Sequence, residues 1–182
     1  MTDELNDILL GCIDGKRSAQ ECLYRLYSPK MFAVCLRYSG NYDEAKDVLH
    51  DGFIKVFDKI KQFGQRGSLE GWVRRIMVNT ALERYRRANP VVLFEQLPEI
   101  HIEPEEDPEP CIPMNELLGY IQCLPEKYRM VFNMYIFDEM THKEIAESLG
   151  ISEGTSKSDL SRARGILQNK INNRVGHVAK TG

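Results

Sequence analysis

The stretch THKEIAESLGISEGTSKSDLSRARGIL, residues 141–167, predicts two helices separated by a short turn. Thr141 and Glu144 have the T-x-x-E spacing of a capping box, which marks the start of a helix. Gly150 stands where a helix commonly ends in the left-handed conformation, and Ser152 is suited to cap the helix that follows. Helix, glycine-containing turn and helix in this order are typical of a helix-turn-helix.

The second helix of this stretch has an inward and an outward face. Four residues recur at helical spacing and are expected to pack inward, namely Ser156, Leu160, Ala163 and Leu167. Four polar residues are expected to point outward and are the candidate DNA-contacting residues, namely Lys157, Ser158, Ser161 and Arg162. Such side chains suit base edges and phosphates in a major groove. A helical hairpin with a solvated charged face would show the same periodicity, but the capping box and the turn glycine favour DNA binding.

The charge of the chain is unevenly distributed. The 182 residues carry a formal net charge of −3, and this length is enough for one or two compact domains. Residues 95–116 contain eight acidic residues and no Lys or Arg, whereas residues 141–182 contain seven basic and four acidic residues. The predicted DNA-reading element therefore lies in a positively charged part of an acidic chain.

Proline divides the chain. Residues 88–113, ANPVVLFEQLPEIHIEPEEDPEPCIP, contain six of the eight prolines. Proline interrupts helices, so we expect an extended, flexible, Pro/Glu-rich linker here. The predicted order is N-terminal domain, acidic linker, C-terminal domain and tail, at residues 1–89, 90–113, 114–174 and 175–182.

The N-terminal domain has helical periodicity throughout. A first helix is predicted to end at Gly15, and Ser18 with Glu21 has the spacing of another capping box. DEAKDVLHDGFIKVFDKI, residues 43–60, is a long amphipathic helix, although Gly52 weakens that prediction slightly. Ser68 is suited to cap a further helix, residues 69–87. Outside the linker no convincing period-2 strand occurs, so the predicted fold is all-α, with two small helical domains.

Two polar stripes lie on these helices. The long helix carries an acidic stripe formed by Asp47, His50, Asp51, Ile54 and Asp58. The helix after it carries a basic stripe at i, i+4 and i+11, formed by Arg75, Asn79 and Arg86. Each stripe alone also fits a helix face that is simply solvated.

Several classes of protein are disfavoured. No apolar run approaches the ~20 residues of a membrane span, and the acidic start MTDELNDILL lacks the basic region of a signal peptide. We therefore expect a cytoplasmic protein without direct membrane insertion. The five cysteines have no C-x-x-C spacing, and those within helical patterns are predicted to be core residues. No metal or other cofactor is expected, and the absence of a P-loop ending, nucleophile elbow or H-E-x-x-H argues against an enzyme.

Three motifs in order resemble those of bacterial sigma factors. DEAKDVLHDGFIKVFDKI resembles the conserved region 2 helix, and GSLEGWVRRIMVNTALERYRR, residues 67–87, resembles the W-[LV]-x-R-I-x-x-N segment that follows it. LPEKYRMVFNMYIFDEMTHKEIAESLGISEGTSKSDLSRARGIL, residues 124–167, resembles region 4. With only regions 2 and 4 and a linker, the chain resembles the extracytoplasmic function (ECF) group of the sigma-70 family.

The resemblance implies a function and partners. Such a protein binds core RNA polymerase and directs it to promoter DNA. The polymerase-binding role falls on Asp47, His50 and Asp51, with His50 where the family usually has Gln. Contact with the −10 element falls on Arg75, Asn79 and Arg86, and contact with the −35 element falls on Lys157, Ser158, Ser161 and Arg162. Asp159 stands where the family often has a basic residue, which is expected to weaken phosphate attraction there.

The resemblance extends to the linker and to regulation. In the family the linker runs through polymerase near the RNA path, and an anti-sigma factor commonly restrains the protein. The runner-up hypothesis is a stand-alone helix-turn-helix transcriptional regulator, and a third is a helical adaptor protein without DNA binding. The aromatic and Arg-rich helix around Trp72, in register with region 2, favours the sigma factor.

Overall fold

The computed structural model describes residues 3–64, 67–90 and 113–178. Within these residues the chain forms eight α-helices and one short 3-10 helix, with no strand, which confirms the predicted all-α class. The chain divides into two compact units, Met1–Tyr85 and Arg86–Gly182, and the division falls in the last turn of α4. The predicted linker lies outside the described residues except at its two ends, and the predicted domain limits stay a prediction.

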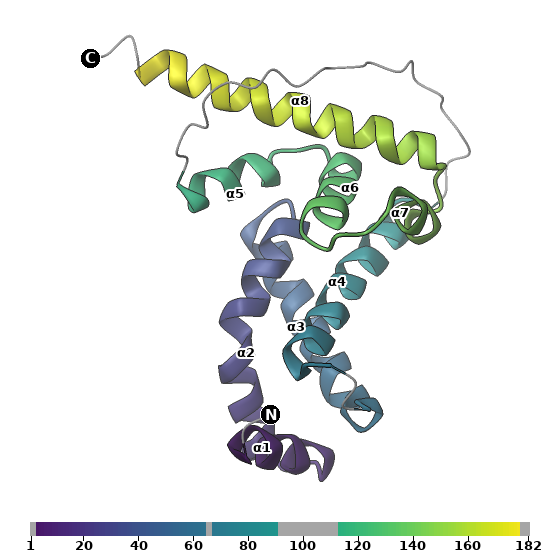
Figure 1. Cartoon of the computed structure of the whole chain (residues 1–182). Helices are drawn as coiled ribbons and strands as arrows, with labels where there is room; N and C mark the ends of the chain where they lie inside the picture. Colours follow the sequence, from purple (N-terminus) through teal and green to yellow (C-terminus); the bar gives the residue numbers. More distant parts are fainter. Residues whose placement is uncertain (1–2, 65–66, 91–112, 179–182) are drawn as a thin grey trace. The chain divides into compact units, whose positions relative to one another are not determined.

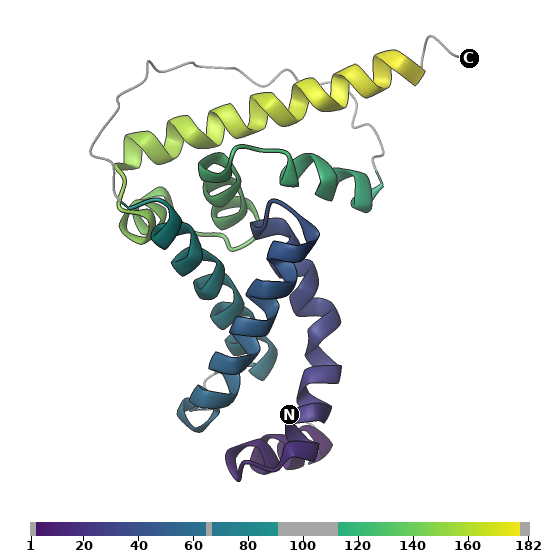
Figure 2. The same cartoon turned by 180° about the vertical axis from the view of Figure 1, so that it is seen from behind.

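The first unit is a small helical bundle. Its elements are α1 (Asp3–Ile13), α2 (Arg17–Tyr38), α3 (Tyr42–Lys59), the 3-10 helix η1 (Ile60–Gln62) and α4 (Leu69–Ala88). Figures 1 and 2 show α2 beside α3, with α1 lying across the N-terminal end of α2. The buried side chains include Leu23, Val56 and Val73, one from each of the three long helices.

Gly52 is the point at which α3 meets α4. A Cβ atom built on Gly52 would overlap Sδ of Met77, so any side chain at this position requires Met77 to move. Glycine costs about 1 kcal/mol relative to alanine inside a helix. Gly52 therefore lowers the helix propensity of α3 but allows the close contact with Met77.

Local signals place most helix ends in the first unit. Gly15 has the left-handed φ of 75° that ends α1, as predicted. Ser68 Oγ accepts a hydrogen bond from the Gly71 N–H at 3.0 Å and thereby starts α4, as predicted. The predicted capping box at Ser18 and Glu21 is wrong. Because Lys16 is already the extended N-cap residue, α2 begins before Ser18, which lies within the first helical turn.

The second unit contains four helices, α5 (Met114–Gln122), α6 (Glu126–Ile136), α7 (His142–Leu149) and α8 (Glu153–Val178). Helix α8 is the longest and lies against the other three (Figure 1). Its apolar face joins α5 in a core cluster of Ile121, Leu124, Ala163 and Leu167. Helix α8 continues four residues beyond residue 174, at which the predicted domain ended.

The predicted burial of the cysteines is only partly confirmed. Cys12 and Cys35 are buried, as predicted, and burial raises the pKa of the Cys35 thiol to about 12. Cys22 and Cys123 are exposed, so their predicted core positions are wrong. Cys22 lies in α2 next to the buried Leu23, and Cys123 is the C-cap residue of α5, where the helical period ends. Cys111 lies outside the described residues.

Candidate nucleic-acid and protein interfaces

Local hydrogen bonds build the helix-turn-helix of α7 and α8. The Thr141 N–H donates to Glu144 Oε2 at 2.8 Å, and the Glu144 N–H donates to Thr141 Oγ1 at 3.3 Å. These bonds lower the pKa of Glu144, because they favour its charged form. Gly150 ends α7 with a φ of 69°, and Ser152 Oγ accepts from the Thr155 N–H at 3.0 Å. The predicted start, turn and second cap are confirmed.

The inward face of α8 includes one polar residue with a specific partner. Ser156, Leu160, Ala163 and Leu167 are all buried, as predicted. Ser156 Oγ lies 3.0 Å from His142 Nδ1, and the His142 ring stacks on Tyr135 with 4.8 Å between ring centroids. Burial and the positive charge of Lys157 lower the pKa of His142. This contact ties the start of α7 to the first turn of α8.

The four candidate −35 residues differ in exposure. Lys157 is exposed, whereas Ser158, Ser161 and Arg162 are half-buried. The guanidinium of Arg162 is held from outside its own helix, because Nη1 donates to the Tyr128 hydroxyl of α6 at 3.3 Å. The sequence pattern places these residues on one side of α8 but contains no signal for the contact with Tyr128.

Asp159 occupies a different place from the one expected. Only 3% of the residue is exposed, and its carboxylate lies 3.6 Å from Nζ of Lys127 in the first turn of α6. Burial raises the pKa of Asp159, while the positive charges of Lys127 and Arg162 lower it. The carboxylate therefore faces Lys127 of α6, and the expected weakening of phosphate attraction at this position stays a prediction.

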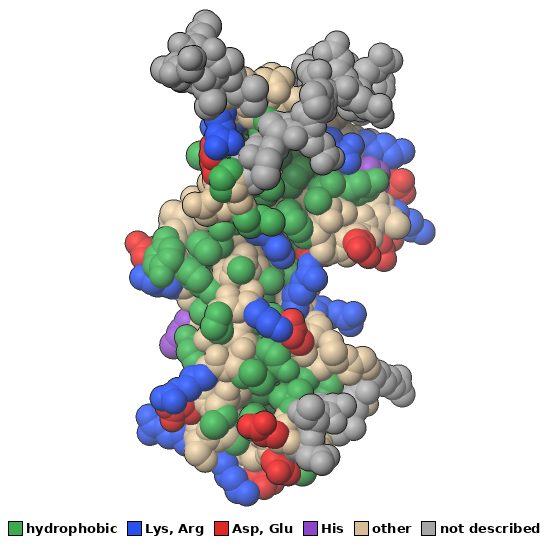
Figure 3. Space-filling view, turned by 60° about the vertical axis from the view of Figure 1, so that its left-hand side comes forward, with side chains coloured by type: hydrophobic (Ala, Val, Ile, Leu, Met, Phe, Trp, Pro, Cys, Tyr) green, Lys and Arg blue, Asp and Glu red, His purple; other side chains and the backbone are tan. Residues whose placement is uncertain are grey.

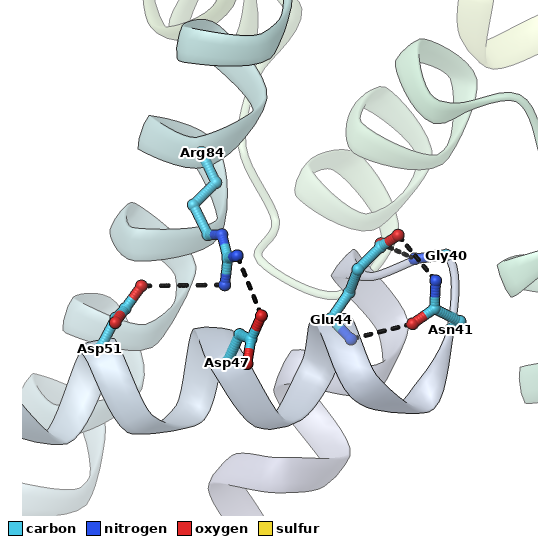
Figure 4. Close-up of polar contacts among 6 residues, drawn as sticks. All are labelled: Gly40, Asn41, Glu44, Asp47, Asp51 and Arg84. Carbon is cyan, nitrogen blue, oxygen red and sulfur yellow. Dashed lines mark hydrogen bonds and ion pairs between the residues drawn. The ribbon is translucent and has the colours of Figure 1, made fainter.

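The acidic stripe of α3 has a basic partner on α4. Asp47, His50 and Asp51 are exposed, as a protein-binding surface requires. Figure 4 shows the guanidinium of Arg84 between the two carboxylates, with Nη2 3.2 Å from Asp47 and Nη1 3.7 Å from Asp51. Sequence reasoning missed this pairing. The pattern indicated only a basic helix that follows an acidic one.

The basic stripe of α4 lies on another side of the helix. Arg75, Asn79 and Arg86 are exposed and share one face at i, i+4 and i+11. Arg84 is nine residues after Arg75, which is roughly half a revolution around a helix of 3.6 residues per turn. Helix α4 therefore offers one polar face to α3 and carries Arg75 and Asn79 on another, exposed face. Residues 65 and 66 of the preceding loop lie outside the described residues.

An apolar residue accompanies the acidic stripe. Ile54 follows Asp51 on α3 and is 50% exposed, although its side chain is large and hydrophobic. Figure 3 shows hydrophobic side chains reaching the surface among basic and acidic ones on the visible face.

The described residues lack two other kinds of feature. No group of three or more His, Cys, Asp and Glu side chains there is arranged to hold a metal ion. No helix in the same part of the chain combines the length and apolar character that crossing a membrane requires.

Comparison with known proteins finds two sigma factor regions in chain order. The family described as Sigma-70 region 2 matches residues 23–90, and Sigma-70 region 4 matches residues 114–167. The ECF RNA polymerase sigma factor SigW of Bacillus subtilis is 27% identical over 170 residues, covering 86% of this chain and 91% of the relative. SigE of Mycolicibacterium smegmatis, also named an ECF RNA polymerase sigma factor, is 30% identical over 166 residues. That match covers 87% of this chain but only 64% of the relative.

A solved structure has the same fold. The sigma factor RpoE of Bartonella quintana, crystallised with the anti-sigma factor NepR, matches with a TM-score of 0.51 and 21% sequence identity. The match covers 84% of this chain and 96% of the solved chain. At this identity the likeness concerns the fold alone.

Proposed function

Because the chain belongs to the ECF group of the sigma-70 family, we propose that it binds core RNA polymerase through α3 and promoter DNA through α4 and α8. The chain is a transcription initiation sigma factor. The observation that carries the proposal is that region 2 and region 4 match in order on the two separate helical units.

Polymerase binding is assigned to Asp47, His50 and Asp51. The three side chains are exposed on one stripe of α3, and Arg84 holds both carboxylates in defined positions. Charged groups of this kind steer association and fix the register of an interface. The exposed Ile54 adds apolar area next to them. Imidazole at position 50 retains the hydrogen-bonding capacity of the glutamine that is usual in the family.

Contact with the −10 element is assigned to Arg75, Asn79 and Arg86. An unpaired promoter strand presents phosphates to cations and base edges to amides, and both kinds of group occur on this stripe. Its position on α4, away from Arg84, separates DNA contact from polymerase contact. Helix α4 then supports the acidic side chains of α3 through Arg84 and carries the DNA-contacting residues on another face.

Contact with the −35 element is assigned to Lys157, Ser158, Ser161 and Arg162. They lie in the N-terminal half of α8, which is the second helix of the helix-turn-helix and the part that reaches base edges in such motifs. The hydrogen bonds around Thr141, Gly150 and Ser152 fix the turn between α7 and α8 and thereby the angle between the two helices.

The acidic charge of the chain is compatible with these roles. Polymerase supplies much of the non-specific affinity for DNA, so the sigma factor itself needs little such affinity. Residues 95–116, with eight acidic residues and no basic residue, suit a channel built to hold a polyanion and disfavour binding to free DNA. We assign this segment to the RNA path of polymerase.

The proposal also covers the cellular location of the protein and its regulation. The protein acts in the cytoplasm, where core polymerase is found, and works as an initiation factor without catalysing a reaction. An anti-sigma factor is a further expected partner, since the RpoE structure with a similar fold was solved with one.

Run-off transcription with the full-length protein and core RNA polymerase tests the proposal. We expect transcripts that begin at a defined set of start sites only when both proteins are present. The runner-up, a stand-alone helix-turn-helix regulator, would instead shift duplex DNA without polymerase. Start sites that do not depend on the added protein would overturn the assignment.

A further inference from the structure

We propose that Tyr128 and Asp159 are positioning residues that hold Arg162 in the direction from which it reads one base pair of the −35 element. The proposal rests on the function assigned to α8 above. It adds two residues from outside the predicted DNA-contacting set, one of them on a different helix.

The buried carboxylate of Asp159 is the first observation. A carboxylate that is 3% exposed requires a cationic or hydrogen-bonding partner, because burial of an unpaired charge is costly. Lys127 supplies that charge from α6, with its Nζ at 3.6 Å, and its own side chain is 45% exposed. The pair fixes the rotation of α8 relative to the first turn of α6.

The second observation is the hydrogen bond between Arg162 and Tyr128. Nη1 of Arg162 lies 3.3 Å from the tyrosine hydroxyl, and Lys127 Nζ lies 4.9 Å from the centre of the same ring. Asp159 and Arg162 are three residues apart and so lie on adjoining parts of the α8 surface. Lys127, Tyr128, Asp159 and Arg162 together form a group that we call the α6–α8 polar cluster.

The cluster restricts the guanidinium through the hydrogen bond from Nη1 to Tyr128. Arginine has five N–H donors in a planar fork, so one can bond Tyr128 while others remain for DNA. An arginine without such a support reaches several neighbouring phosphates and bases from one Cα position. A supported arginine meets one base edge repeatedly, and sequence preference at that base pair therefore depends on the tyrosine hydroxyl.

The test uses holoenzyme assembled from core polymerase and full-length variants, with a promoter library randomised across the −35 element. Arg162→Ala first identifies the position at which preference is lost. We expect Tyr128→Phe to lower the preference at that position by roughly 5-fold, the factor that corresponds to one net hydrogen bond. Preference at the other positions should stay unchanged. Asp159→Asn and Lys127→Met should act at the same position, and Lys127→Arg should retain the wild-type pattern.

Tyr120→Phe is the matched control. It removes a tyrosine hydroxyl from α5 that bonds Glu116 and has no assigned part in DNA contact. We expect this variant to retain the wild-type preference. Thermal unfolding of each variant separates positioning from stability, because a merely structural role would lower activity on all promoters alike.

The outcomes distinguish the two levels of the proposal. A wild-type holoenzyme without any −35 preference would overturn the assigned function of α8. A clear wild-type preference that Tyr128→Phe leaves intact, or lowers equally at every position, would overturn the positioning role while leaving the function of α8 standing.

Discussion

Gly52 of α3 faces Met77 of α4 so closely that no side-chain carbon fits between them. Glycine at this point sets the distance between the helix assigned to polymerase and the helix assigned to the −10 element. Any added atom must move Met77 or separate the two helices. Two proposed interfaces of the first unit thus depend on one missing methyl group.

Gly52→Ala is expected to destabilise the first unit, because overpacking a core costs typically about 1–3 kcal/mol. Alanine regains about 1 kcal/mol of helix propensity, so we expect a net loss of up to about 2 kcal/mol. The single tryptophan, Trp72, lies in α4, so its fluorescence reports urea unfolding of this unit. Gly64→Ala is the control, since no atom lies within 4 Å of its added Cβ. Equal free energies of unfolding for Gly52→Ala and wild type would contradict the close contact.

Asp47→Asn combined with Asp51→Asn is expected to weaken binding to core polymerase, because both carboxylates of the proposed interface lose their charge. Arg84→Gln should act in the opposite direction. It frees the carboxylates from an exposed ion pair worth up to about 1 kcal/mol, so core binding should strengthen by at most about 5-fold at low salt. Titration of labelled variants with core polymerase measures both effects.

Two comparisons make this prediction specific. Arg25→Gln removes a basic residue that pairs with Glu21 on α2, and it should leave core binding unchanged. In the Asp47→Asn and Asp51→Asn background, Arg84→Gln should have no further effect. An additive effect there would show that Arg84 acts through something other than these two carboxylates.

His142 is expected to make the second unit less stable in acid. Its pKa is lowered in the folded state by burial and by Lys157, so the unfolded chain binds the proton more tightly. The contribution of neutral His142 is present above the unfolded pKa of about 6.5 and is lost as the pH falls toward the lower folded value. Calorimetry between about pH 7.5 and pH 5 should show a smaller fall in Tm for His142→Gln than for wild type. Parallel curves for the two proteins would exclude this role.

Lys157→Ala tests whether the most exposed residue of the α8 set reads a base. A base contact should reduce discrimination at one position of the −35 element by about 1–3 kcal/mol and relax the preference there. A phosphate contact should weaken all promoters alike and lower the salt slope by about one unit. We expect the first result, because Lys157 lies near the N-terminus of α8. A uniform loss across a randomised −35 library would refute base reading by Lys157.

Signals within a few residues of sequence determined the helix-turn-helix. Thr141 with Glu144, Gly150 and Ser152 satisfy backbone groups in their own turn, so their spacing alone predicts the start, the turn and the second start. Local signals of the same kind correctly predicted the end of α1 at Gly15 and the start of α4 after Ser68. It failed at Ser18, because Lys16 is already the N-cap residue and α2 begins at Arg17.

Only the tertiary structure decided which charged residues meet. Arg84 and Asp47 are 37 residues apart, and Arg162 and Tyr128 are 34 residues apart, so no helical period relates them. Periodicity places a side chain on a face but does not tell which neighbouring helix covers that face. In the sequence Asp159 is therefore one more polar residue of α8. Packing against α6 makes it the buried partner of Lys127.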